Sequence, residues 1–136
     1  MKLPIIKSAV LAGGLAFGVS SAFAGDALTV VSWGGAYTKS QIEAYHKPYT
    51  AKYGTKIQSE DYNGGLAEVR AQVEAGKITW DVVDLEVSDA ARGCDDGLFE
   101  KISAGSLPNG VNGALPSKDF IPGALQECAV GTIVWS

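Results

Sequence analysis

Residues 27–37 read ALTVVSWGGAY, an apolar run that leads directly into a tryptophan, two glycines and a tyrosine. The segment ALTVVSW (27–33) is rich in β-branched residues and predicts a strand. A plain turn needs one glycine at most, whereas here Trp33 and Tyr37 flank two residues without side chains. The stretch therefore predicts the first strand of the fold, followed by a surface against which a ligand docks.

Helical and strand-like patterns alternate after this stretch. Apolar residues at three- and four-residue spacing predict a helix over 38–53, which Pro48 should kink or loosen and Gly54 should end. The recurring residues are Ile42, Tyr45, Tyr49 and Tyr53. KIQSEDY (56–62) then predicts a second, less buried strand.

A second helix follows the NGG turn, with apolar residues at Leu66, Val69 and Val73, and stops at Gly76. TWDVVDLE (79–86) predicts a third strand, whose apolar centre suits a parallel sheet covered on both faces. The order strand–helix–strand–helix–strand with short connections predicts an α/β fold with a mostly parallel sheet and helices on both faces.

The remainder of the chain is less periodic. SDAARGCDDGLFEKI (88–102) predicts a short helix and a turn, and the glycines and prolines of 103–123 predict a surface loop region. CAVGTIVWS (128–136) predicts a final strand.

The first 24 residues have the features of a secretory signal peptide. Lys2 and Lys7 form a basic start, a short apolar run follows, and small residues precede Gly25. A membrane anchor is the weaker alternative, because the run is short and interrupted by glycines. We therefore expect a signal peptide at 1–24, a periplasmic location, and an α/β domain over 25–136.

The charge of the exported part argues against two classes of partner. Two of the 11 Lys and Arg residues and none of the 15 Asp and Glu residues lie in the signal segment, so residues 25–136 carry a formal charge of −6. No basic run occurs among them. Nucleic acid and anionic lipid are therefore not expected as partners.

Cys94 and Cys128 are the two cysteines, and His46 is the one histidine. This set provides neither the ligands of a structural zinc or haem site nor a catalytic triad, and His46 is expected on a helix surface. In an oxidising compartment a Cys94–Cys128 disulfide is the natural use of two cysteines, and two separate buried thiols are the alternative.

Ligands in open parallel sheets bind at the carboxyl ends of the strands. This rule places Glu86 and Ser88, which follow the third strand, beside the SWGGAY loop. The alternatives are that Glu86 only begins a solvated loop, that Trp33 is buried under the first helix, and that Tyr37 caps that helix.

Four blocks resemble one known family: LTVVSWGGAY, KPYTAKYG, DVVDLEVSDAARGCDDGLFEKI and ECAVGTIVWS. They are similar to the N-terminal part of periplasmic solute-binding proteins of ABC importers, in the spermidine/putrescine-binding group, from about Leu28 to Ser136. The resemblance implies the first lobe of a bilobal, type II-like binding protein, truncated at the first crossover strand and lacking its second lobe. It also implies no enzymatic activity, no cofactor, a small amine or amino-acid-like solute, and a membrane permease as partner.

The same resemblance implies roles for the opening loop. Trp33 and Tyr37 stand where polyamine binders place aromatic walls, which attract an ammonium group through the ring quadrupole. The Gly34 and Gly35 backbone would approach the solute, and Glu86 and Ser88 are the expected polar neighbours. Polyamine binders usually carry a polar or acidic residue where these glycines stand, so a smaller amino compound with a carboxylate stays open. The alternative function is a secreted α/β enzyme whose catalytic residues lie outside this sequence.

Overall fold

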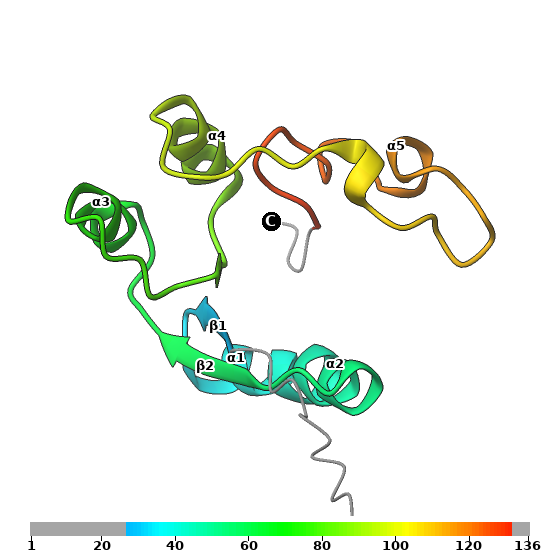
Figure 1. Cartoon of the computed structure of the whole chain (residues 1–136), viewed down its shortest axis with the longest axis horizontal. Coiled ribbons are helices and arrows are strands. Elements are labelled where there is room, and N and C mark those ends of the chain that lie inside the picture. Colours follow the sequence, from blue (N-terminus) through cyan, green and yellow to red (C-terminus); the bar gives the residue numbers. More distant parts are fainter. Residues whose placement is uncertain (1–26, 132–136) are drawn as a thin grey trace, which may run out of the picture.

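The computed structural model describes residues 27–131, and its helices and strands alternate along the chain (Figure 1). In chain order the elements are β1 (Leu28–Ser32), α1 (Gly35–Gln41), the π-helical turn η1 (Ile42–His46), α2 (Lys47–Tyr53), β2 (Ile57–Asp61), α3 (Ala67–Glu74), β3 (Val82–Val83), α4 (Val87–Asp95), the 3₁₀ turn η2 (Ala104–Ser106) and α5 (Pro116–Asp119).

The three strands form one parallel sheet in the order β2-β1-β3. Leu28 lies opposite Ile57 and Ser32 lies opposite Asp61, so β1 and β2 end at the same level. Figure 1 shows α1 and α2 on one side of these strands and α3 and α4 on the other. The predicted α/β fold with a parallel sheet covered on both faces is confirmed.

β3 is shorter than the strand predicted over 79–86, because its pairing with β1 begins only at Val82. Just before that point, the Thr29 N–H donates to the Asp81 carboxylate at 2.8 Å, while the Asp81 N–H donates to the Thr29 carbonyl at 3.0 Å. A side chain thus takes the place of one ladder bond. Val82 is 50% exposed, which fits a short strand at the edge of the described sheet.

The helix predicted over 38–53 is present but begins earlier, at Gly35, and changes its spacing in the middle. Pro48 has no N–H to donate to the carbonyl four residues before it, and the turn that precedes α2 takes the π spacing of η1. This is the loosened turn that the proline predicted. The tyrosine stripe of this helix faces outward: Tyr45, Tyr49 and Tyr53 are all exposed.

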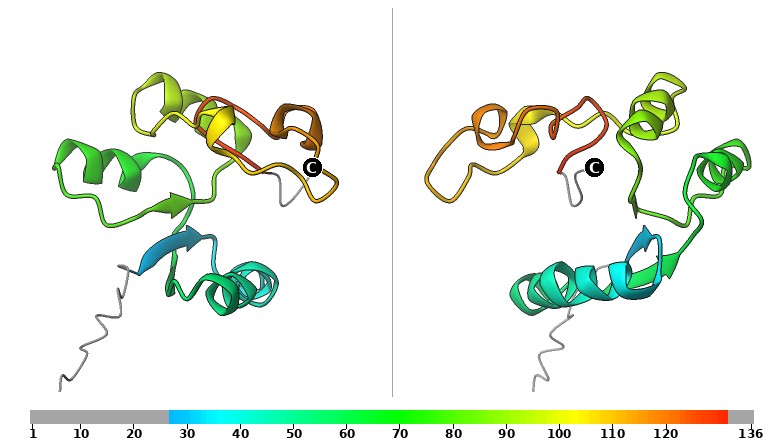
Figure 2. Two further views of the ribbon diagram at one scale, coloured as in Figure 1. Left: turned by 45° about the vertical axis from the view of Figure 1, so that its right-hand side comes forward. Right: turned by 180° about the vertical axis from the view of Figure 1, so that it is seen from behind.

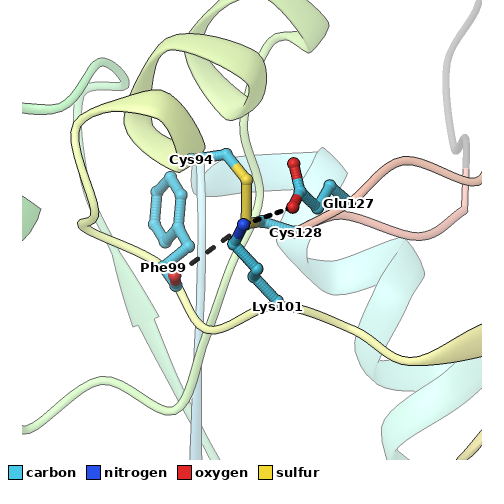
Figure 3. The surroundings of a disulfide bond; sticks show 5 residues. All are labelled: Cys94, Phe99, Lys101, Glu127 and Cys128. Atoms are coloured by element: carbon cyan, nitrogen blue, oxygen red, sulfur yellow. Dashed lines mark hydrogen bonds and ion pairs between the residues drawn. A yellow bond between two sulfur atoms is a disulfide. The ribbon is translucent and has the colours of Figure 1, made fainter.

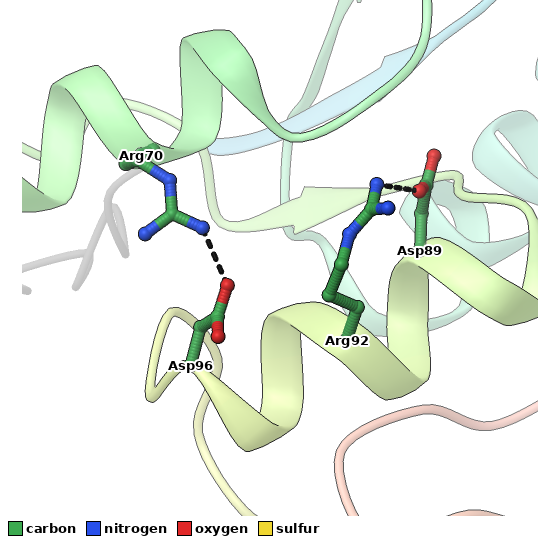
Figure 4. Close-up of polar contacts among 4 residues, drawn as sticks. All are labelled: Arg70, Asp89, Arg92 and Asp96. Atoms are coloured by element: carbon green, nitrogen blue, oxygen red, sulfur yellow. Dashed lines mark hydrogen bonds and ion pairs between the residues drawn. The ribbon is translucent and has the colours of Figure 1, made fainter.

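The core lies between the sheet and the helices α3 and α4. Val31 at the centre of the sheet is completely buried, and its buried companions include Leu66, Val69 and Ala90. Figure 4 shows α3 and α4 side by side, joined by an ion pair between Arg70 and Asp96 with 2.5 Å between Nη2 and Oδ2. Both side chains are substantially exposed, so packing rather than this ion pair holds the helices together.

A disulfide joins the end of α4 to the last described segment of the chain (Figure 3). Cys94 and Cys128 have their Cα atoms 5.7 Å apart, so the predicted pairing is confirmed and the alternative of two thiols is wrong. Beside it, the Ile102 N–H donates to the Glu127 carbonyl at 2.7 Å, and Lys101 forms an ion pair with the Glu127 carboxylate.

The C-terminal third matches its prediction only in part. Residues 103–123 are mainly irregular, as expected, with the short turns η2 and α5 inside them (Figure 2 shows this arm from two sides). Within 128–131 the predicted final strand reduces to a single antiparallel bridge between Leu125 and Val130, and residues 132–136 lie outside the described part, as does the predicted signal peptide at 1–24. None of the helices described is both long and apolar enough for a membrane span.

Candidate functional site

The loop after β1 depends on two glycines in unusual backbone conformations. Gly34 has φ 82° and ψ −175°, a region that only glycine occupies at low cost, and Gly35 has φ 59°. A side chain on Gly34 would also meet Asp61, because an added Cβ would lie 2.9 Å from the Asp61 Oδ2 atom. The glycine pair therefore lets the chain turn from β1 into α1 close to the end of β2.

Three aromatic rings gather at this end of the sheet, and we call Trp33, Tyr37 and Tyr62 the aromatic cluster. The Trp33 and Tyr37 rings meet edge to face with centroids 5.4 Å apart, and Trp33 stacks on Tyr62 with centroids 6.3 Å apart and 22° between the planes. Trp33 is 37% exposed and Tyr37 is half-buried. Trp33 is thus not buried under α1, and Tyr37 does not cap that helix, whose N-cap residue is Gly34.

Tyr62 is the member of the cluster that the sequence analysis missed. It is buried, its N–H donates to the Ser32 carbonyl at 2.9 Å, and its hydroxyl donates to the Asp84 carbonyl. One residue thereby fastens together the ends of all three strands. The sequence held a signal for it, because SWGG (32–35) and DYNGG (61–65) both place an aromatic residue and a glycine pair after a strand.

Several carboxylates act electrostatically on the two tyrosines of the aromatic cluster. Burial, followed by the negative charge of Asp84 and then of Asp89, Glu68 and Glu86, raises the pKa of Tyr62 to about 12. Burial and then the charge of Asp84 also raise the pKa of Tyr37. A negative potential at this edge of the sheet disfavours phenolate and favours a cation.

Asp84 itself is held from the helix side of the loop. The Gln41 side-chain amide on α1 donates to the Asp84 carboxylate, and Gln41 is buried. The Asp84 N–H donates to the Val31 carbonyl at 3.0 Å, which continues the pairing of β1 with β3. Asp84 falls within the strand predicted over 79–86 and was not among the predicted site residues.

Glu86 and Ser88 follow β3, which pairs in parallel with β1, so they lie at the same edge of the sheet as the loop after β1. Glu86 is exposed and is the N-cap residue of α4, while Ser88 is exposed in the first turn of that helix. The charge of Glu86 contributes to the raised pKa values of Tyr37 and Tyr62, so it acts on the cluster. Within residues 27–131 no hydrogen bond joins the Glu86 or Ser88 side chain to the loop after β1.

Asp89, one turn into α4, is already paired. Its carboxylate Oδ1 lies 2.5 Å from Nη2 of Arg92 on the same helix (Figure 4). This contact offsets part of its charge. Asp84 and Glu86 are the carboxylates whose charge raises the pKa of both Tyr37 and Tyr62.

His46 departs from the expected helix-surface position. It is half-buried in η1, its Nδ1 lies 3.0 Å from the Ser59 hydroxyl of β2, and burial lowers its pKa. It lines a hollow of about 490 Å³ formed by η1, α2 and the strand β2, and no member of the aromatic cluster lines it. The described residues hold no group of His, Cys, Asp and Glu side chains that suits a metal ion.

A second cavity, of about 600 Å³, lies beside β3 and is lined by α3, α4 and the segments 98–102 and 128–130. No member of the aromatic cluster lines either of these two cavities. Trp33 is the most exposed member of the cluster, so its indole is the part that solvent reaches at the carboxyl ends of the strands.

Comparison with known proteins identifies relatives for this arrangement. Residues 44–129 match the family model of the bacterial extracellular solute-binding proteins. A γ-aminobutyric acid-binding protein of Pseudomonas aeruginosa PAO1 is 41% identical over 123 residues, which is 90% of this chain. The chain spans 33% of the length of that relative.

Solved structures agree with this family. The PBP AgtB of A. tumefaciens R10, in complex with agropinic acid, is 35% identical and superimposes on 60% of this chain and 26% of its own with a TM-score of 0.56. The Atu4243–GABA receptor is 32% identical over 59% of this chain and 25% of its own, with a TM-score of 0.55. The PBP MotA of A. tumefaciens B6, in complex with glucopine, is 25% identical over 75% of this chain and 29% of its own, with a TM-score of 0.64.

Proposed function

This chain belongs to the family of bacterial extracellular solute-binding proteins, and from that membership we propose that it is part of the periplasmic component that captures a small amino compound for an ABC importer. In this proposal residues 1–24 are a signal peptide and residues 25–136 contribute to the first solute-binding lobe. The membrane partner is the importer's permease. Nothing in the matched relatives supports the alternative of a secreted enzyme.

The observation that carries the proposal is the aromatic cluster together with the carboxylates whose charge acts on its tyrosines. An ammonium group over the face of Trp33 or Tyr37 gains electrostatic attraction, and the attached methylenes pack on the same rings. The negative charges of Asp84 and Glu86 offset the positive charge of the bound ammonium group. This part of the chain is therefore suited to the amine end of a solute.

The finer choice is between a polyamine and an amino-acid-like solute, and we favour the second. The backbone at Gly34 and Gly35 carries no side chain that could bind a second ammonium group. The Gly34 N–H donates to the Thr38 hydroxyl, so the Gly35 amide is the one suited to a carboxylate or carbonyl. Two relatives are named for γ-aminobutyric acid, which bears one amine and one carboxylate. We assign Trp33, Tyr37, the Gly34 and Gly35 backbone, Glu86 and Ser88 to the solute site.

Titration calorimetry on the protein at its full natural length tests this function. The probes are γ-aminobutyric acid, putrescine, spermidine and the amine-free analogue butyric acid. We expect binding of γ-aminobutyric acid, weaker or no binding of the polyamines, and none of butyric acid. If butyric acid binds as tightly as γ-aminobutyric acid, the amine is not what the site recognises. If no amine binds, the proposed function is wrong.

Substitution of Trp33 by alanine then tests the site. The loss expected for a desolvated cation–π contact is roughly 1–2 kcal/mol, or about 5- to 30-fold in affinity. Tyr49→Ala is the matched control, since Tyr49 is exposed to a similar degree (41%) but lies on α2 outside the cluster. Equal affinities for the two variants and the parent would make the loop a plain turn.

A further inference from the structure

We propose that Thr38 and Asp61 form a positioning pair that holds the loop bearing Trp33 in the conformation that binds solute. The inference rests on the proposed function, since the loop matters only where it contacts a ligand. Neither residue belongs to the site assigned above. Their role follows from a chain of hydrogen bonds that runs from the loop backbone to the end of β2.

The Thr38 hydroxyl makes two hydrogen bonds in opposite senses. It accepts from the Gly34 N–H at 2.8 Å and donates to Oδ1 of Asp61 at 3.0 Å. The Thr38 N–H also donates to the Gly34 carbonyl at 3.2 Å. Gly34 is the N-cap residue of α1 and has no side chain to cap the helix. Thr38 satisfies the Gly34 N–H from within the helix, as the reciprocal bond of a capping box does.

The Thr38 hydroxyl is shielded from water. Thr38 is only 6% exposed, so water competes weakly for its two bonds. The acceptor on Asp61 is a carboxylate, and hydrogen bonds to ionised acceptors are stronger than neutral ones. Loss of the hydroxyl would leave the Gly34 N–H without this partner.

The end of β2 is a firm anchor for this chain of bonds. Asp61 lies opposite Ser32 in the sheet, and the Tyr62 N–H donates to the Ser32 carbonyl at 2.9 Å. Trp33 lies between Ser32 and Gly34, which are both tied to this strand end, the first by backbone and the second through Thr38. The backbone on each side of the tryptophan is thus fixed to the end of β2, at Ser32 through the Tyr62 N–H and at Gly34 through Thr38 and Asp61.

The glycine at 34 is part of the same device. An added Cβ would lie 2.9 Å from Oδ2 and 3.1 Å from Cγ of Asp61, so the missing side chain makes room for the carboxylate. The close approach of Asp61 and the glycine-only backbone conformation of Gly34 therefore depend on each other. A preorganised loop improves affinity because less ordering is left for the solute to impose.

The competing role for Asp61 is direct contact with the solute's ammonium group, and the choice of variants separates the two. Asp61→Asn keeps an oxygen that can accept from Thr38 but removes the charge, whereas Asp61→Ala removes both. Thr38→Val keeps the shape of the side chain but removes the hydroxyl, and Thr38→Ser restores it.

The experiment is calorimetry with γ-aminobutyric acid on the full-length protein and these four variants. We expect Thr38→Val and Asp61→Ala to bind roughly 5- to 10-fold more weakly, the scale of one hydrogen bond, with Thr38→Ser and Asp61→Asn within about 2-fold of the parent. In a Trp33→Ala background, Thr38→Val should lower the affinity little further, because the tryptophan that Thr38 positions is gone. Unchanged affinity of Thr38→Val, full additivity with Trp33→Ala, or an Asp61→Asn loss equal to that of Asp61→Ala would each overturn the proposal.

A second readout does not depend on the solute. The indole N–H resonance of Trp33, identified by its absence in Trp33→Phe, should move in Thr38→Val and return in Thr38→Ser. If the parent binds no amine, the proposed function fails, and the positioning pair is judged by this resonance alone. A Trp33 resonance that stays in place in Thr38→Val would overturn it.

Discussion

The indole of Trp33 lies over the ring of Tyr62 with 22° between their planes and 6.3 Å between their centroids. This stack joins the residue after β1 to the residue after β2, across a pair of strands that end in register. Gly64 lies against the indole as well, because a Cβ on that glycine would lie 2.9 Å from Nε1 of Trp33. The orientation of the exposed tryptophan is therefore set by its neighbours on the β2 side.

Gly64→Ala should disturb the tryptophan, and Gly65→Ala provides a matched control. Both glycines have a positive φ, 84° and 79°, so each substitution carries the backbone cost of about 1–2 kcal/mol. Only the Cβ at 64 meets Trp33, whereas nothing lies within 4 Å of a Cβ at 65. We expect the two variants to lose similar stability in urea, with a shifted tryptophan emission and weaker amine binding for Gly64→Ala alone.

Two results would contradict this expectation. If both variants shift the emission equally, the effect comes from the backbone of the NGG turn rather than from contact with the indole. If neither lowers the affinity for amine, the orientation of Trp33 does not matter for binding.

Reduction of the Cys94–Cys128 disulfide should destabilise the protein and release the 98–131 segment from α4. The two cysteines are 34 residues apart, and the chain-entropy model gives about 4 kcal/mol for closing a loop of that length. The neighbouring Lys101–Glu127 ion pair is well exposed and should add little. The measurement is urea unfolding with and without reductant.

The control is the double variant Cys94→Ser/Cys128→Ser, which should match the reduced parent and should not respond to reductant. An unfolding midpoint of the parent that stays constant on reduction, with free thiols verified by intact mass, would refute a stabilising role for the bond.

The main elements of the fold were predictable because local patterns and tertiary structure agree. β1 follows from its apolar, β-branched run and β2 from the alternating pattern of KIQSEDY. α3 follows from the spacing of Leu66 and Val69, which are both buried. The length of β3 was not predictable, since it depends on the Asp81 side chain replacing a ladder bond to Thr29. A side-chain contact of this kind leaves no period in the sequence.

The candidate site shows the same division. The gathering of the strand ends followed from the rule for parallel sheets, and it placed the loop after β1 near Glu86. Tyr62 was missed because the predicted strand 56–62 includes it as its last residue, which hid the match between DYNGG and SWGG. The contact of Thr38 with Asp61 joins residues 23 positions apart and exists only once β1 and β2 are in register.

Tyr62→Phe should lower the stability of the protein without emptying the aromatic cluster. The ring stays, so the stack with Trp33 is kept, but the hydrogen bond from the hydroxyl to the Asp84 carbonyl is lost. The expected loss is about 1 kcal/mol in the free energy of unfolding, and affinity for amine should change by less than about 2-fold. A large loss of affinity with unchanged stability would instead make the Tyr62 hydroxyl a direct solute contact.

The same variant isolates a pH dependence at the alkaline end. A tyrosine in an unfolded chain has a pKa of about 10, whereas burial and Asp84 raise the pKa of Tyr62 to about 12 in the fold. As pH rises from about 10 to about 12, the unfolded state releases the phenolic proton first, so the contribution of Tyr62 to stability is complete below that range and is lost across it. Urea unfolding at a series of pH values should therefore show a steeper alkaline loss for the parent than for Tyr62→Phe, in which lysine ionisation is unaltered. Parallel curves for the two proteins would mean that the Tyr62 hydroxyl ionises as readily in the fold as in the unfolded chain.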